Sequence, residues 1–379
     1  MIYSSFGNKE LSKLGFGAMR LPLLADATTI DEKQVADMVD YAMQNGINYF
    51  DTAYPYHGGL SEVVLGKALK KYPRDTYYLA NKYPGHQHTD HYDPAAIFNH
   101  QLKKCDVEYF DFYLMHNVCE NSIDVYLDPQ WGMLDYFLQQ KKEGRIHHLG
   151  FSSHADLPTL KRFLDSEWGS HMEFCQIQLN HLDWTLQKAK EKCELLSERN
   201  IPIWVMEPLR GGKLAEEGVG PAFRWLQGIE GVKVILSGMS NLQQMKDNIS
   251  VFESFKTLTE EDKQHLKRVE ESLLNNIPCT ACRYCCDGCP QGFDIPMLIR
   301  TLNDMRVQPS FTTTMYIESL PDELQPKSCL DCGACKEICP QGIDVPSAMK
   351  ELTERYEATP KWADICRQRN EEARRLAGD

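Results

Sequence analysis

Short apolar runs and amphipathic stretches alternate at a steady pace along about the first 250 residues of the chain. The apolar runs predict buried strands near residues 14–19, 47–52, 76–82, 109–115, 146–152, 174–179, 201–206 and 232–237. The stretches between them predict helices near residues 31–44, 61–71, 94–105, 131–143, 156–166, 186–199, 221–227 and 241–253. This alternation fits a (β/α)8 TIM barrel better than an open sheet. No G-x-G-x-x-G opens a helix after the first strand, which weakens the open-sheet alternative.

The chain before and after the barrel pattern behaves differently. Two short apolar runs around Gly7-Asn8 predict a hairpin lid ahead of the first barrel strand. A further helix is expected from Thr259 to about Leu274, and after it the composition changes to a cysteine-rich repeat. We therefore place a domain boundary near residue 275, between a barrel of residues 1–275 and a smaller domain of residues 276–379.

Charge and composition narrow the function classes. The chain has 41 Lys and Arg against 54 Asp and Glu, a formal net charge of −13. This charge disfavours nucleic acids and anionic membranes as main partners. The sequence opens on no leader and holds no apolar run of membrane-spanning length, so we expect a cytoplasmic protein without a membrane partner. In such a long chain, the 14 cysteines point to metal or redox sites rather than to disulfides.

Eight of the cysteines follow the pattern C-x2-C-x2-C-x3-C-P twice, which is typical of [4Fe–4S] clusters. Three thiolates on one loop hold three corners of a cluster, and the fourth cysteine of each run binds the other cluster. The first predicted cluster has the ligands Cys279, Cys282, Cys285 and Cys339. The second has the ligands Cys329, Cys332, Cys335 and Cys289. Two structural zinc sites are the less favoured alternative, because zinc uses paired C-x2-C knuckles with distant spacing. The role of Cys286 stays open.

The cysteine repeat resembles the bacterial-type two-cluster ferredoxins. Each Cys-Pro is followed by an Asp-Ile-Pro or Asp-Val-Pro, in which Asp294 and Asp344 are expected to cap helices over residues 297–305 and 347–356. The segment is therefore more similar to the α-helical ferredoxins that occur as subunits or domains of larger redox enzymes. This resemblance covers residues 276–357 and implies a small α-helical ferredoxin-like domain that transfers electrons.

Polar residues that can take part in acid–base chemistry follow three successive strands of the predicted barrel. Asp51 closes one strand and Tyr56 follows it, Lys82 closes the next strand, and His116 closes the one after. The carboxyl ends of the strands form the catalytic face of a β/α barrel, so these side chains are expected to meet there. A free phenol holds its proton tightly, and a nearby cation lowers its pKa. The pattern therefore predicts an acid–base site.

This pattern resembles that of the aldo/keto reductases, in which D-x-x-x-x-Y is followed by a lysine and a histidine. The resemblance runs through most of residues 1–275. It implies NAD(P)H-dependent reduction of an aldehyde or ketone to an alcohol, or the reverse. Tyr56 is then the general acid, Lys82 depresses its pKa, Asp51 holds Lys82, and His116 orients the carbonyl oxygen.

The same resemblance implies a set of cofactor-binding residues along the later strands. Near the carboxamide the resemblance implies Ser152, Ser153 and Gln176, and at the position that stacks on the nicotinamide it implies Met206. The loop over the pyrophosphate is expected to consist of Glu207, Pro208, Leu209, Arg210 and Gly211, and the adenosine side of Gly238, Ser240, Gln244, Asp247 and Asn248. For the last group a plain capped strand-to-helix connection is the alternative. Met206 stands where many members have an aromatic ring, and Gly238 or Met239 and Gln244 stand where NADPH-specific members have Lys and Arg. The choice between NAD and NADP stays open, because Arg210 and Lys213 are close by.

Three functional hypotheses remain at this stage. In the first, a carbonyl reductase exchanges electrons through its clusters; because hydride moves two electrons and a cluster one, this needs a flavin on a redox partner, a flavoprotein or a ferredoxin-linked protein. In the second, the clusters are structural or sense oxygen. In the third, the barrel is a nucleotide-binding docking subunit and the tail is the working electron carrier. The substrate is a small carbonyl or alcohol, and the candidate pocket walls are Tyr54, His57, His86, His88, Trp131 and Trp184.

Overall fold

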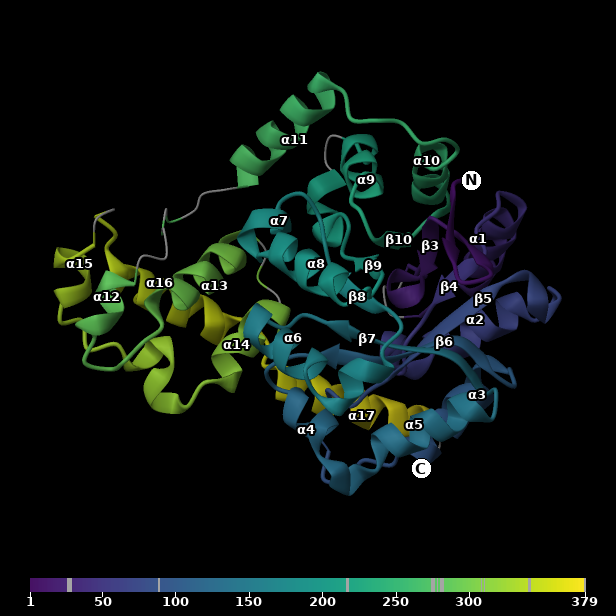
Figure 1. Ribbon diagram of the computed structural model, residues 1–379, viewed down its shortest axis with the longest axis horizontal. Helices are drawn as coiled ribbons and strands as arrows, with labels where there is room; N and C mark the ends of the chain where they lie inside the picture. Colours follow the sequence, from purple (N-terminus) through teal and green to yellow (C-terminus); the bar gives the residue numbers. More distant parts are fainter. Residues whose placement is uncertain are drawn as a thin grey trace. The chain divides into compact units, whose positions relative to one another are not determined.

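The structure is a computed structural model of the chain, shown as a ribbon in Figure 1. It describes residues 1–25, 29–87, 89–215, 218–273, 277, 279, 283–307, 309, 311–339 and 342–377. The predicted boundary near residue 275, the cysteine at position 282 and the histidine at position 88 lie outside these residues.

Within the described residues, eight strands close into a barrel in the order β10-β3-β4-β5-β6-β7-β8-β9, and all neighbouring pairs are parallel. The strands are β3 Leu14–Gly17, β4 Tyr49–Asp51, β5 Tyr78–Tyr83, β6 Phe110–Val118, β7 Ile146–Ser153, β8 Cys175–Gln178, β9 Ile203–Met206 and β10 Val232–Gly238. Each lies within a few residues of a predicted strand. The predicted (β/α)8 barrel is confirmed.

Helices surround the barrel on its outside (Figure 1). They are α1 Glu32–Gln44, α2 Ser61–Leu69, α3 Pro94–Cys105, α4 Ile123–Leu127, α5 Met133–Lys142, α6 Leu157–Leu164, α7 Asp183–Leu186, α8 Ala189–Glu198, α9 Gly220–Gln227 and α10 Leu242–Val251. The next helix, α11 Glu260–Leu273, begins in the barrel unit and ends in the second unit described below. Several begin at an aspartate whose side chain accepts a backbone N–H of the first turn, as Asp31 does for α1 and Asp156 for α6. Each cap marks the residue at which a loop from the carboxyl end of a strand ends and the next helix begins.

The predicted hairpin is present as β1 Tyr3–Phe6 and β2 Lys9–Ser12, which pair antiparallel. The ring of Phe6 contacts Phe112 near the start of β6 and Trp204 near the start of β9, with centroid distances of 5.7 and 5.3 Å. The hairpin therefore covers the amino-terminal end of the barrel, because it packs on residues at the beginnings of strands. The opposite end, where the predicted site residues lie, is left to the loops.

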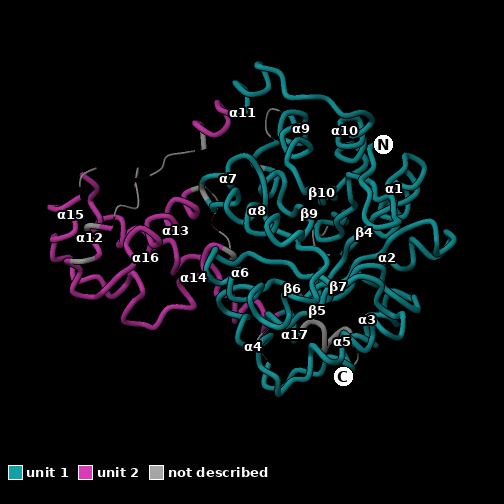
Figure 2. The backbone as a smooth tube through the Cα atoms, in the orientation of Figure 1, with its two compact units in different colours: residues 1–266, 369–379 teal, residues 267–368 magenta. Residues whose placement is uncertain are grey.

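The chain divides into two compact units, coloured separately in Figure 2. Unit 1 holds residues 1–266 and 369–379, and unit 2 holds residues 267–368. Unit 2 contains the predicted helical tail, with α12 Tyr284–Asp287, α13 Ile295–Val307, α14 Phe311–Ser319, α15 Ala334–Glu337, α16 Val345–Ala358 and the first part of α17 Trp362–Ala377. The expected helices over 297–305 and 347–356 correspond to α13 and α16, whereas α14 and α17 were not predicted.

Unit 2 has a hydrophobic core of its own. Leu298, Leu302 and Met305 of α13 cluster with Met349 and Leu352 of α16, and all are almost completely buried. No helix among the described residues combines the length and the apolar composition that a bilayer crossing needs.

The packing of α2 on the end of α3 gives a test of the barrel wall. A Cβ at Gly66 would lie 2.4 Å from the carbonyl oxygen of Cys105, so we expect Gly66→Ala to lower the free energy of unfolding by about 1–3 kcal/mol despite alanine's higher helix propensity. Gly228→Ala is the matched control, because its Cβ would meet no atom closer than 3.4 Å. Urea unfolding of both variants measures the difference, and equal stabilities would contradict the tight contact.

Candidate functional sites

Lys82 occupies the centre of the predicted acid–base site. Its side chain is fully buried and its ammonium donates to the Asp51 carboxylate, and also to the backbone carbonyl of Thr52 at 2.8 Å. The hydroxyl of Tyr56 lies 3.5 Å from Lys82 Nζ, and the ammonium is 5.0 Å from the centre of the Tyr56 ring. β4 and β5 are hydrogen-bonded neighbours, which is why the lysine on one reaches the carboxylate at the end of the other. The structure thus places a cation between a carboxylate and a phenol.

Burial and mutual charge interactions shift the pKa values of Tyr56 and Lys82. Burial raises the pKa of Tyr56 above its ordinary value, and the Lys82 cation opposes this shift without reversing it. Burial alone would lower the pKa of Lys82, but Asp51 and Tyr56 together hold it above its ordinary value. At neutral pH the phenol therefore keeps its proton beside a charged ammonium. Lys82 thus lowers the pKa of Tyr56 as expected, but burial outweighs this effect and the pKa stays above its ordinary value.

His116 completes the predicted set from β6. Its ring packs edge-on against that of Tyr56, with 5.8 Å between centroids, and against that of His86, with 4.4 Å between centroids. Burial, together with His86 and Lys82, holds the pKa of His116 well below its usual range. The ring is neutral near pH 7, and its buried Nδ1 has no hydrogen-bond partner in the structure. Such an imidazole can make a hydrogen bond to a substrate oxygen.

Gln176 and Met206 form the part of the mouth where the nicotinamide carboxamide is expected. Gln176 Nε2 lies 3.7 Å from Met206 Sδ, and Gln176 Oε1 is buried without a hydrogen-bond partner in the structure. The hydroxyl of Ser152 accepts the backbone N–H of Asn117 at 2.8 Å, so its own proton is left for another acceptor. A carboxamide, which both donates and accepts, fits this pair. The hydroxyl of Ser153 instead donates to the carbonyl of Val118 at 2.8 Å.

The loop after β9 has a strained backbone and a buried anchor. Glu207 and Arg210 have positive φ angles of 52° and 45°, and Gly211 and Gly212 continue the left-handed path. Glu207 accepts the N–H of Gly211 at 2.8 Å, with Arg20 3.7 Å from its other oxygen. Pro208 and Leu209 lie between Glu207 and Arg210 in the sequence.

The side chain of Arg210 is buried and donates to Asp183 at 2.7 Å. Asp183 also accepts the side-chain amides of Asn180 and Gln178 at 2.6 and 2.8 Å, so it is a hub for the loops after β8 and β9. Arg210 thus anchors the loop, and a direct contact with a cofactor phosphate stays a prediction.

The expected adenosine segment lies between β10 and α10. Gln244 donates its backbone N–H to Asn241 at 2.9 Å and accepts the N–H of Ser240 at 2.8 Å, which is a capped strand-to-helix connection. Asn248 is buried and donates to the hydroxyl of Ser237 at 3.0 Å. A Cβ at Gly238 would lie 3.2 Å from the side chain of Arg20. Asp247 is on the surface and accepts the side chain of Gln243 at 2.8 Å.

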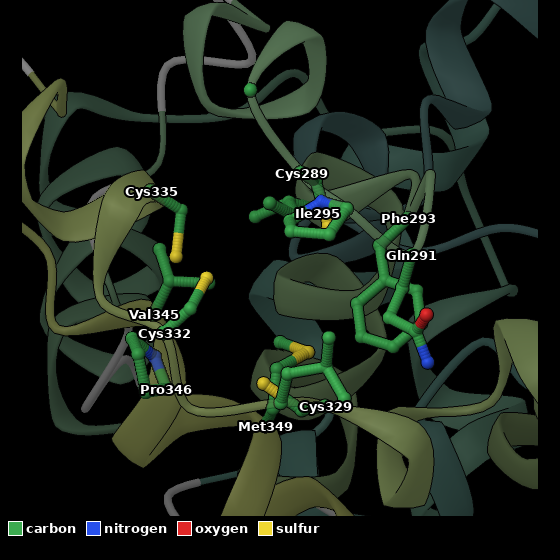
Figure 3. A pocket seen from close by; sticks show the side chains of 13 residues that line it. Cys289, Gln291, Phe293, Ile295, Cys329, Cys332, Cys335, Val345, Pro346 and Met349 are labelled. Carbon is green, nitrogen blue, oxygen red and sulfur yellow. The ribbon is translucent and has the colours of Figure 1, made fainter.

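In unit 2, the second predicted cluster site is a pocket lined by residues of both halves of the cysteine repeat. The side chains of Cys289, Cys329, Cys332 and Cys335 surround it (Figure 3). Its other walls are mostly apolar and include Phe293, Ile295, Val345 and Met349. The four cysteines from both halves of the repeat thus meet as predicted, and a cavity ringed by thiols suits a four-iron cube.

The first predicted cluster site is only partly described, because Cys282 lies outside the described residues. Burial raises the pKa of Cys285 to about 12, with Cys286 and Cys279 as neighbours that add to the shift. Cys339 packs against the same core. Among the residues that the structure describes, no three His, Cys, Asp or Glu side chains are grouped tightly enough to hold a single metal ion. The four thiolates of a [4Fe–4S] cluster lie farther apart than the ligands of a single metal ion, because they surround a larger group.

Two structural residues of the barrel mouth were missed by the sequence analysis. Asp183 holds Arg210, and the hydroxyl of Tyr126 donates to the backbone carbonyl of His116 at 2.8 Å. Neither lies at a strand end or in a motif, and Asp183 is 27 residues away from Arg210 in the chain. An acidic residue facing an arginine cannot be paired from sequence alone, and α4 is too short to show a helical period.

Comparison with known proteins matches both parts of the chain to protein families. The family model "Aldo/keto reductase family" matches residues 13–222, which is more than half of the chain. The model "4Fe-4S dicluster domain" matches residues 278–343.

Among curated relatives, a probable aldo-keto reductase 1 of Glycine max is 30% identical over 221 residues, which are 55% of this chain and 59% of the relative. The NADH-specific methylglyoxal reductase of Escherichia coli K12 is 26% identical over 202 residues, 49% of this chain and 59% of the relative. The chain thus spans about three-fifths of the length of these two relatives. A solved aldo-keto reductase of Bacillus halodurans in its holo form is 25% identical with a TM-score of 0.58, over 71% of this chain and 96% of that chain.

The anchor beneath the β9 loop gives a test. We expect Asp183→Ala to lower the free energy of unfolding by about 3 kcal/mol, because it leaves the buried guanidinium of Arg210 without its carboxylate. Asp124→Ala is the matched control, since Asp124 and its partner Arg162 are largely exposed, and we expect it to stay within about 0.5 kcal/mol of the parent. Urea denaturation compares them; similar losses in both variants would show that the Asp183 pair does not hold the loop.

Proposed function

The chain belongs to the aldo/keto reductase family, and we propose that it reduces a small aldehyde or ketone with NADH or NADPH, or catalyses the reverse oxidation. The observation that carries this proposal is the Lys82 ammonium, which lies between the Asp51 carboxylate and the Tyr56 hydroxyl 3.5 Å away. The neutral ring of His116 lies beside the same phenol. The name of the E. coli relative, an NADH-specific methylglyoxal reductase, supports carbonyl reduction.

Each residue then has a distinct task. The nicotinamide, when bound, supplies the hydride to the carbonyl carbon. Tyr56 keeps its proton until the oxygen gains charge and then donates it, and Lys82 stabilises the phenolate that remains. Asp51 fixes the position of Lys82. His116 donates a hydrogen bond to the carbonyl oxygen and sets its orientation.

The residues at the barrel mouth suit a nicotinamide cofactor. Gln176 Oε1 and the hydroxyl of Ser152 are poised for the carboxamide, and Met206 lies beside them. The loop from Glu207 to Gly211, anchored by Arg210, is the segment proposed to cover the pyrophosphate. We propose the capped start of α10 as the adenosine side, and assays with NADH and NADPH decide between the two cofactors.

The C-terminal unit is proposed to hold two [4Fe–4S] clusters. One has Cys329, Cys332, Cys335 and Cys289 as ligands, and the cavity that these four line supports it. The other has Cys279, Cys282, Cys285 and Cys339 as ligands. Because each cluster passes single electrons and hydride carries two, exchange with the barrel needs a flavin on a partner protein. We therefore propose a redox partner of the flavoprotein or ferredoxin-linked type.

Replacing the proposed acid tests the reaction. Tyr56→Phe removes the only atom that Tyr56 has for proton transfer, so we expect kcat/KM for carbonyl reduction to fall about a hundredfold to ten-thousandfold. The affinity for NADH or NADPH, followed by fluorescence titration, should change little. Tyr72→Phe is the matched control, because the Tyr72 hydroxyl bonds Asp40 away from the site. Full turnover by Tyr56→Phe would remove Tyr56 as the acid and favour the docking-subunit hypothesis.

Iron analysis of anaerobically purified protein tests the clusters. The unaltered chain should hold about eight irons and Cys332→Ser about four, because serine replaces one ligand of a single cluster. The EPR spectrum after dithionite reduction should lose one of two cluster signals in the variant. Cys193→Ala, which removes a cysteine of helix α8 in the barrel unit, should keep all the iron. One zinc per site in place of iron would contradict the assignment.

A further inference from the structure

The strand that carries Lys82 extends beyond its neighbour β4. β4 ends at Asp51, whose Cα partner on β5 is Ala80, and the N–H of Thr52 donates to the carbonyl of Ala80 at 3.0 Å. In a parallel ladder the next bond would join the N–H of Lys82 to the carbonyl of Thr52. That carbonyl instead accepts the ammonium of Lys82 at 2.8 Å. The backbone of Lys82 is buried and therefore needs hydrogen-bond partners from outside the sheet.

Two amide side chains supply these partners. Asn81 Oδ1 accepts the N–H of Lys82 at 2.8 Å. Gln101, on α3, donates through Nε2 to the carbonyl of Lys82 and to Asn81 Oδ1, both at 2.9 Å. Both amide side chains are completely buried. For this one residue, they replace the backbone bonds that a longer β4 would provide.

The two amides are themselves held by the elements around them. Asn81 Nδ2 donates to Glu62 Oε1 of α2 at 2.7 Å, and Glu62 is paired with Lys104 of α3. The hydroxyl of Tyr113, on β6, donates to Gln101 Oε1. Each amide oxygen therefore faces a donor, and each amide nitrogen faces an acceptor. A buried network that is satisfied in this way keeps its side chains in one arrangement.

The place of this network matters for the proposed site. Apolar side chains could fill the space between β5 and the helices, but they would leave the N–H and carbonyl of Lys82 buried without partners. The hydroxyl of Tyr56 lies 3.5 Å from Lys82 Nζ, which is close to the limit of a hydrogen bond. A small shift of the Lys82 backbone is therefore enough to break this contact.

We propose that Asn81 and Gln101 are positioning residues, which fix the backbone of Lys82 beyond the end of β4 and so keep its ammonium beside the Tyr56 hydroxyl. This inference rests on the proposed carbonyl reduction. There the nicotinamide hydride goes to the carbonyl carbon and the Tyr56 proton to the carbonyl oxygen, which gives the alcohol, the oxidised nicotinamide and a tyrosinate. Lys82 stabilises that tyrosinate, so its displacement slows the chemical step.

Gln101→Met tests the inference, because it removes the donor to the Lys82 carbonyl and keeps the length of the side chain. We expect kcat for reduction of methylglyoxal by the full chain to fall about tenfold to a hundredfold. KM and the affinity for NADH or NADPH should change little, because neither amide contacts the proposed ligands. The solvent deuterium isotope effect on kcat should increase, because proton donation becomes slower relative to the other steps.

Gln140→Met is the matched control, with the same substitution on α5. Gln140 is 5% exposed, and its Oε1 accepts the Arg145 guanidinium at 2.7 Å beside the amino-terminal end of β7, away from the site. Urea unfolding measures what each variant costs in stability, and only Gln101→Met should lower kcat. Hydrogen–deuterium exchange of the peptide that contains Lys82 should be faster only in Gln101→Met, which tests the backbone contact without an activity assay.

Two milder variants extend the series. Tyr113→Phe removes only the hydroxyl that orients Gln101, and we expect it to lower kcat about threefold; it decides the question if Gln101→Met does not fold. Gln101→Glu keeps an acceptor for Tyr113, and its carboxyl, held protonated by burial, donates to the Lys82 carbonyl. It should therefore restore part of the kcat that Gln101→Met loses.

The outcomes separate this inference from the proposed reaction. The same kcat in Gln101→Met and Tyr113→Phe as in the unaltered protein, or an equal loss in Gln140→Met, overturns the positioning roles and leaves the reductase standing. If the unaltered protein reduces neither methylglyoxal nor benzaldehyde with NADH or NADPH, the proposed reduction is wrong and this inference falls with it.

Discussion

The burial of one ammonium group is the constraint on which the barrel mouth depends. Removing Lys82 from water costs several kcal/mol unless the charge is compensated, and Asp51 and the Thr52 carbonyl supply that compensation. Both partners stand at the end of β4, so the compensation exists only while β4 and β5 stay in register. The phenol of Tyr56 is buried beside the same charge, which is why its proton is held tightly yet has a cation ready for the anion it leaves. The contact between β4 and β5 and the proposed acid–base chemistry thus depend on the same buried ammonium.

Much of this arrangement could be read from sequence because parallel strands deliver their last residues to one face. Lys82 and His116 close successive strands, so their meeting with Asp51 and Tyr56 followed from the barrel alone. The grouping of Cys289 with Cys329, Cys332 and Cys335 followed from motif spacing in the same way. The upward shift of the Tyr56 pKa could not be predicted from the sequence. Burial outweighs the effect of the nearby cation, and a motif at a strand end does not show how deeply its residues are buried.

The residues that tie the loops were beyond sequence reasoning for a different reason. Tyr126 bonds the carbonyl of His116, and Asp183 gathers Arg210 with two amides, through contacts that depend on where loops come to rest. Tyr126 lies in α4, a helix of five residues, and Asp183 begins α7, a helix of four residues. Helices this short show no hydrophobic periodicity from which a buried face could be predicted. Such residues touch no reacting atom in the proposed mechanism. They decide which side chains face one another at the mouth, as the contact of His86 with His116 illustrates.

The path of the chain has a consequence for how the protein can be taken apart. The polypeptide leaves the barrel unit after residue 266 and rejoins it from residue 369, so residues 267–368 form an insertion rather than an appendage. Truncation at the end of the barrel pattern would also delete the terminal segment that carries Arg369. Removing the iron–sulfur unit without losing part of the barrel unit therefore requires two chain breaks and a new peptide bond. A single proteolytic cut in either connection leaves residues 267–368 covalently joined to one part of unit 1.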